Sequence, residues 1–185
     1  MLDSFLDNPA AAAAGFFALV CLTVCPLFRT RSGILWAQLG AGVGFASHYA
    51  LLGIAAPSLV NVLGSVQTGA ALFSTRSEAL NRVGYGLIPL MIGVGSYFWT
   101  GPTSALCVVA MGLIALGRMQ ENQWTLRLLI LARGVFWSAH DYLEGAWIAH
   151  TADLLSLTMG VGMLASMALA ENFRLRPRVE AAATP

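Results

Sequence analysis

The stretch GILWAQLGAGVGFASHYALLG, residues 33–53, decides how the rest of the chain is interpreted. It contains no Asp, Glu, Lys or Arg, and about 20 consecutive apolar residues let an α-helix cross the hydrocarbon core of a bilayer. Two arginines, Arg29 and Arg31, lie just before it. The stretch therefore predicts a membrane-spanning helix that is bounded by charge on one side.

The same pattern extends along the whole chain of 185 residues, of which 57% are hydrophobic and 10% are charged. Soluble domains average about 25% charged residues, so this composition excludes an ordinary soluble protein. We predict an all-α integral membrane protein with a single transmembrane domain, residues 1–171, and a disordered cytoplasmic tail, residues 172–185. Turns separate seven predicted helices. They span residues 9–28, 33–53, 57–75, 83–99, 102–117, 125–147 and 149–170.

The basic residues predict the orientation of these helices. All ten are arginine, and cytoplasmic loops of membrane proteins are enriched in Lys and Arg. Nine of them lie in or beside the turns after the first, third and fifth predicted helices, or after the seventh. The opposite turns contain none, so we expect the N-terminus outside and the C-terminus inside the cell. The nine residues are Arg29, Arg31, Arg76, Arg82, Arg118, Arg127, Arg174, Arg176 and Arg178.

The two halves of the chain are related by an offset of 92 residues, which aligns His48 with His140 without a gap. The same offset superimposes the first three predicted helices on the last three. It therefore predicts two parallel three-helix repeats, about 9–75 and 102–170, joined by a linker helix at 83–99.

Two resemblances follow. The three-plus-one-plus-three plan resembles that of the SWEET and PQ-loop superfamily of small seven-helix transporters, although the chain has no Pro-Gln dipeptide. More closely, His48-Tyr-Ala-Leu-Leu-Gly followed by Asn61, and His140-Asp-Tyr-Leu-Glu-Gly, is similar to patterns of the YgjV-type bacterial inner-membrane proteins. That family carries an arginine just after the asparagine, where this chain has Gly64. The resemblance implies a multi-pass protein of the bacterial inner membrane and says little about chemistry.

Polar residues inside the predicted spans are candidate site residues, because a membrane interior makes them costly. His48 and Asn61 are expected at similar depth in the membrane, on either side of an outer turn. The 92-residue offset places His140 and Asp153 at similar depth to each other in the same way. We expect these four residues to form one ring in the outer half of the membrane. Two further residues are expected to line it, Ser65 and Ser156.

The sixth predicted helix carries a polar stripe on one face, because its members recur at helical spacing. Such a face is expected to look into the bundle or into a water-filled cavity. Two alternatives stay open: the ends of the stripe reach the two membrane surfaces, and the ring residues form only interhelical hydrogen bonds. The stripe consists of Arg133, Trp137, His140, Asp141 and Glu144.

Other classes of function find little support. The net charge of +1 and the lack of a basic stripe argue against nucleic-acid binding. The histidines lack the spacing typical of a metal site. The serines near His48 and His140 point to other helix faces, which argues against a hydrolase. We therefore predict no catalytic residues, no metal and no cofactor.

The favoured interpretation is a carrier or channel for a small polar solute, whose site lies between the two repeats. The alternative is a non-transporting scaffold or assembly protein whose polar stripe, within residues 125–147, contacts a partner. The lipid bilayer is the expected surrounding in both cases. The sequence leaves open the substrate, ion coupling and whether the protein is a homo-oligomer.

Overall fold

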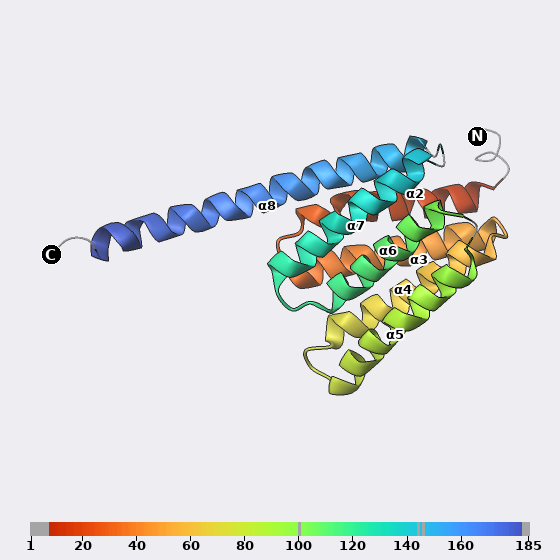
Figure 1. Ribbon diagram of the computed structural model, residues 1–185, viewed down its shortest axis with the longest axis horizontal. Coiled ribbons are helices and arrows are strands. Elements are labelled where there is room, and N and C mark those ends of the chain that lie inside the picture. Colours follow the sequence, from red (N-terminus) through yellow and green to blue (C-terminus); the bar gives the residue numbers. More distant parts are fainter. Residues whose placement is uncertain (1–7, 100, 144, 146, 183–185) are drawn as a thin grey trace.

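The computed structural model describes residues 8–99, 101–143, 145 and 147–182, and only the backbone at 55–56, 147–149 and 172–182. Within these residues the chain forms seven α-helices, one short 3-10 turn and no strand, as predicted (Figure 1). The helices are α2 (Pro9–Val24), α3 (Arg31–Leu51), α4 (Ala55–Phe73), α5 (Glu78–Tyr97), α6 (Thr103–Met119), α7 (Gln123–Leu143) and α8 (Trp147–Ala182), and the turn is η1 (Cys25–Leu27).

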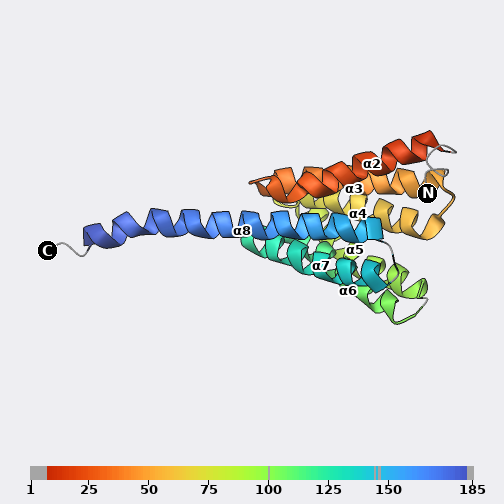
Figure 2. The same ribbon diagram turned by 90° about the horizontal axis from the view of Figure 1, so that it is seen from above.

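The helices pack in two groups of three. In the first group, α3 lies between α2 and α4, and in the second, α7 lies between α6 and α8. We call them the first triplet and the second triplet. Helix α5 packs against α4 and α6 and so connects the triplets, while α8 also touches α2 and η1 (Figures 1 and 2). The triplets therefore meet along two seams, one at α5 and one at α8.

The second and third helices of the two triplets begin at positions 92 residues apart. Helices α3 and α7 have bounds that differ by 92 residues at both ends, and so do the first residues of α4 and α8. The turns after α3 and α7 each contain a glycine with positive φ, 73° at Gly53 and 69° at Gly145. Only glycine adopts that conformation readily, so the two hairpins share a turn geometry as well as a length.

The predicted helices lie within a few residues of the observed ones, except at the last. Helix α8 continues to Ala182, whereas the sequence analysis ends it near residue 170 and treats residues 172–185 as disordered. The backbone of residues 172–182 is helical, and the helix continues through Pro177. The added turns carry α8 well beyond the rest of the bundle (Figure 2).

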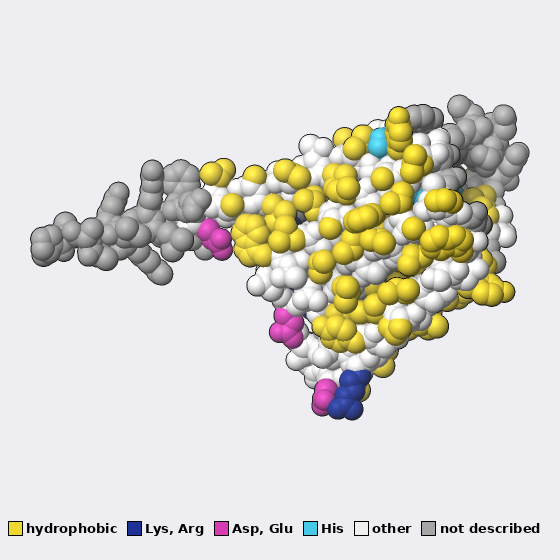
Figure 3. Space-filling model, viewed as in Figure 1, with side chains coloured by type: hydrophobic (Ala, Val, Ile, Leu, Met, Phe, Trp, Pro, Cys, Tyr) yellow, Lys and Arg dark blue, Asp and Glu magenta, His cyan; other side chains and the backbone are white. Residues whose placement is uncertain are grey.

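Large apolar side chains cover the outside of the bundle (Figure 3). Phe16, Trp36 and Tyr97 are exposed by 66%, 57% and 84%, which would promote aggregation in water but suits contact with lipid. Two helical stretches, 9–27 and 150–171, are long and apolar enough by themselves to cross a membrane. The core between the triplets contains small and flexible side chains such as Ala71, Ala115 and Met91.

Candidate functional site

His48, expected in the ring, faces the neighbouring helix α2. Its Nδ1 lies 2.7 Å from the carbonyl oxygen of Ala11, and its ring covers Gly15, where an added Cβ would lie 2.8 Å from Nδ1. As a donor to that carbonyl, the imidazole is satisfied within the first triplet. His48 therefore stabilises the contact between α2 and α3 rather than pointing towards the second triplet.

Two polar residues of α4 that were expected at the site, Asn61 and Ser65, form hydrogen bonds within their own helix. Asn61 Nδ2 donates to the carbonyl oxygen of Pro57 at 2.8 Å, and Ser65 Oγ donates to that of Asn61 at 2.8 Å. Bonds of this kind satisfy a side chain without any ligand. The half of the predicted ring that comes from the first triplet is thus engaged in local hydrogen bonds.

The second triplet brings several predicted residues together. His140 Nδ1 lies 3.0 Å from Asp141 Oδ1, and the Trp137 ring meets the His140 ring edge-on with centroids 5.5 Å apart. Asp141 is only 8% exposed. This part of the stripe therefore points into the bundle, as predicted; Glu144 lies outside the described residues.

A second carboxyl group joins this cluster from α8. Asp153 is 6% exposed and lies within electrostatic reach of Arg133, Asp141 and His150. Asp141 in turn lies within reach of the Tyr49 hydroxyl on α3. Both buried carboxyl groups thus lie near the surface where the two triplets meet.

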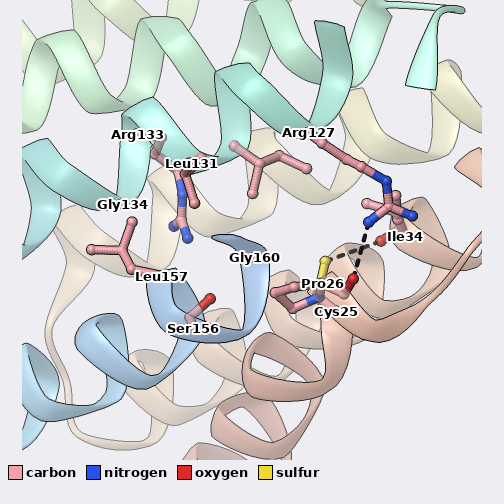
Figure 4. A pocket seen from close by; sticks show the side chains of 11 residues that line it. Cys25, Pro26, Ile34, Arg127, Leu131, Arg133, Gly134, Ser156, Leu157 and Gly160 are labelled. Carbon is pink, nitrogen blue, oxygen red and sulfur yellow. Dashed lines mark hydrogen bonds between the residues drawn. The ribbon is translucent and has the colours of Figure 1, made fainter. Parts of the chain in front are cut away.

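Arg133 lies at the middle of α7, and its side chain extends towards Ser156 and Gly160 on α8 (Figure 4). It lines a cavity of about 20 Å³, which has room for about one water molecule. The Arg133 Nε is buried and has no hydrogen-bond partner among the described residues. The wall opposite α7 and α8 comes from the first triplet. The cavity is lined by Cys25, Pro26, Ile34, Arg127, Ile130, Leu131, Arg133, Gly134, Ser156, Leu157 and Gly160.

Arg118 centres a buried polar network that the sequence analysis missed. Its Nε donates to Gln38 Oε1 at 2.9 Å, and its Nη1 donates to Gln67 Oε1 at 3.3 Å. Gln67, which is 0% exposed, donates from Nε2 to the carbonyl oxygens of Gly84 and Ala115, each at 3.1 Å. The network therefore links α3, α4, α5 and α6.

Two glutamines within apolar spans were the signal for this network. A buried amide is costly unless it is hydrogen-bonded, so the side chains of Gln38 and Gln67 each require hydrogen-bond partners inside the bundle. Arg118 was assigned to a turn because of its position in the sequence. Its long side chain instead reaches back into the bundle beside Gly64, where an added Cβ would lie 3.1 Å from Arg118 Nη1.

Arg31 binds the end of α6 from the first triplet. Its Nε donates to the carbonyl oxygen of Gln120 at 2.7 Å, and its Nη2 donates to that of Arg118 at 3.1 Å. The last carbonyls of a helix lack partners within the helix and attract a cation. Arg31 thus links the first triplet to the second.

Arg127 forms the reciprocal link from the second triplet. Its Nη1 donates to the carbonyl oxygen of Pro26 at 3.0 Å, and its Nη2 donates to that of Phe28. Positions 26 and 28 are offset by 92 residues from the acceptor positions 118 and 120 of Arg31. We call Arg31 and Arg127 the arginine clasps, because Arg31 connects the first triplet to the end of α6 and Arg127 connects the second triplet to the turn η1 and the residue that follows it.

Comparisons with known proteins give the family and no closer relative. No match was found among curated proteins, and none among solved structures. A family model described as bacterial inner membrane protein, Imp-YgjV, matches residues 10–168. That match covers most of the chain, so this protein belongs to the Imp-YgjV family of bacterial inner membrane proteins.

Proposed function

We propose that this membrane protein is a carrier or channel for a small polar solute, which passes between the two triplets. In this proposal the triplets are parallel repeats joined by α5, as in SWEET-like transporters. The matching bounds of α3 and α7 and the two positive-φ glycines support the repeat. The concentration of arginines at one end of the bundle supports an N-terminus outside and a C-terminus inside.

The observation that carries this proposal is the burial of charged groups where the triplets meet. Asp141 and Asp153 are buried, and the half-buried Arg133 lies within electrostatic reach of Asp153, in a bundle whose outside is apolar. Ionisable groups inside a membrane are costly and are generally retained for function. A protein that served only as a membrane scaffold would gain nothing from keeping them away from its surface, so their burial disfavours a partner-binding stripe.

The site differs in composition from the ring expected from the sequence. It is centred on the second triplet, with Arg133, Trp137, His140 and Asp141 on α7 and Asp153 and Ser156 on α8. Residues His48 and Asn61 have a packing role instead, since their hydrogen bonds stay within the first triplet.

The arginine clasps supply a gate. They connect the triplets at the arginine-rich end of the bundle, and the cavity that Arg127 lines has room for about one water molecule. This conformation is therefore closed at that end. Passage of a solute would require the clasps to release and one triplet to move against the other.

The test is solute flux into liposomes that contain the purified protein, screened over small sugars, amino acids and organic and inorganic ions. Asp153→Asn is compared with Thr158→Val, a matched change on α8. Thr158 is exposed and donates to the carbonyl oxygen of Leu154 in its own helix. We expect wild-type flux above that of empty liposomes, a loss of about tenfold in Asp153→Asn and no loss in Thr158→Val. Flux equal to that of empty liposomes, or equal in Asp153→Asn and wild type, would refute the proposal.

A further inference from the structure

The same interior points to the chemical class of the solute, and this step rests on the proposed function. We propose that the solute is a small oxyanion, a carboxylate or phosphate, bound between Arg118, Arg133 and Gln38. These residues come from α6, α7 and α3, so the binding site would span both triplets.

The first argument is an excess of positive charge around one point. The Cys25 thiol lies within electrostatic reach of Arg118, Arg127 and Arg133, and Arg118 lies within reach of Arg133. In the described part of the chain, none of these three guanidinium groups has a carboxylate within ion-pair distance. Like charges that share a membrane interior repel one another, and an anion between them would relieve that repulsion.

The second argument is that hydrogen-bond donors here lack acceptors. Gln38 is only 5% exposed, and its Nε2 has no oxygen or nitrogen acceptor among the described residues, although the Cys25 thiol lies close to the side chain. Its Oε1 already accepts from Arg118, so the amide group presents its N–H donors to the interior. The Nε of Arg133 also lacks an acceptor. Since a guanidinium group can only donate, the ligand that completes this arrangement must bring acceptor oxygens.

Arg118 and Arg133 differ from Arg127 in the groups that they contact. Both Nη atoms of Arg127 bind the carbonyls of Pro26 and Phe28, so Arg127 serves as a clasp, although its Nε, like that of Arg133, is buried without a partner among the described residues. Arg118 binds neutral amide oxygens, which a charged oxygen can replace with a stronger bond. Arg133 has Asp153 in electrostatic reach but forms no ion pair with it. Arg133 and Arg118 are therefore the cations left to bind an anion.

The expected path of the anion follows from this placement. Arg118 lies at the end of α6 on the arginine-rich side, and Arg133 lies at the middle of α7. Once the clasps release, an anion from that side would meet Arg118 first and Arg133 next. A cation entering by the same route would be repelled at both positions.

The binding test uses the purified full-length protein in nanodiscs of zwitterionic lipid. Its Tm is followed against inorganic phosphate and acetate, with chloride at equal ionic strength as the reference. We expect a rise of about 5 °C at saturation, lost in Arg133→Gln and kept in Arg82→Gln. Arg82 is exposed and pairs only with Glu78 on the surface of α5. Because Arg118→Gln would break the buried network, Gln38→Glu serves as the second variant. It keeps an acceptor oxygen for Arg118 and removes the N–H donors, so it should also lose the rise.

Two results would overturn the inference. One is a Tm that responds equally to phosphate, acetate and chloride, or equally in wild type and Arg133→Gln. The other is stabilisation by phosphatidylglycerol in the nanodisc but not by free phosphate, which would assign the cluster to a lipid headgroup.

Flux separates this inference from the proposed function. Binding of phosphate or acetate without flux of any solute would support the anion site and refute the carrier. Flux of a cation or neutral solute, without anion binding, would support the carrier and refute the anion site.

Discussion

The two triplets have the same helical plan and use their polar residues in opposite ways. In the first, Ser58, Asn61 and Thr68 donate to backbone carbonyls of α3 or α4. In the second, Asp141 and Asp153 are buried side by side on neighbouring helices. The comparison teaches that two triplets with the same helical arrangement can differ in role, because one uses its polar side chains for packing and the other buries ionisable groups between its helices.

The packing of α2 against α3 in the first triplet can be disrupted at Gly44, and this substitution is expected to have the largest effect on stability. An added Cβ would lie 2.8 Å from Ala18 Cβ and 3.1 Å from the Ala14 carbonyl oxygen, so α2 would have to move. We expect Gly44→Ala to lower the free energy of unfolding by about 2 kcal/mol, measured by denaturant titration in detergent. Gly93→Ala, which meets nothing within 4 Å, should leave it unchanged; equal losses in both variants would contradict the packing described.

The clasps can be opened by Arg127→Ala. Cys25 is buried beside the cavity, so its reaction with a water-soluble maleimide reports on access from the arginine-rich end. In a background without Cys21 and Cys107, we expect labelling to rise about tenfold, because the lost bonds are charge-assisted. Arg82→Ala is the control, and labelling that stays at the wild-type rate in Arg127→Ala would argue against a gate.

The two histidines provide the sharpest contrast between the triplets. His140→Ala removes the partner of Asp141 and should lower solute flux severalfold. His48→Ala removes one hydrogen bond between helices and should cost about 0.6 kcal/mol of stability while leaving flux unchanged. Flux and the free energy of unfolding are measured on both variants. A loss of flux in His48→Ala but not in His140→Ala would place the site in the first triplet instead.

The smallest expected effect compares two threonines that both donate within their own helix. Thr68 is fully buried in α4, and Thr158 is exposed on α8. We expect Thr68→Val to lower the free energy of unfolding by about 0.6 kcal/mol and Thr158→Val to change it less. A larger loss at Thr158 would mean that α8 has a partner on its exposed face.

The sequence predicted the seven helices because their boundaries follow from apolar length and from the turns. It also predicted that the Trp137, His140 and Asp141 face points inward, since helical spacing alone determines which residues share a face. It did not predict which neighbouring helix such a face would meet. His48 shows this limit, because its helix is buried on several sides and its imidazole turned to α2.

Long side chains account for most of what sequence reasoning missed. Arg118, Arg31 and Arg127 appear in or near turns, and their positions were interpreted as signs of orientation alone. Each guanidinium group instead reaches a carbonyl or amide oxygen on another helix. Such contacts depend on how the triplets pack against each other. The pattern of residues along a single helix carries no information about that packing.

The interface between the triplets is tested most directly by solute leakage from liposomes that contain the double variant Arg31→Ala, Arg127→Ala. Its control is Arg76→Ala, Arg82→Ala, which removes the same charge from two exposed positions of the same end. If solute passes between the triplets, the clasp variant will release solute faster than wild type and the control will match wild type. Equal leakage from both variants, wild type and protein-free liposomes would contradict a pathway at this interface.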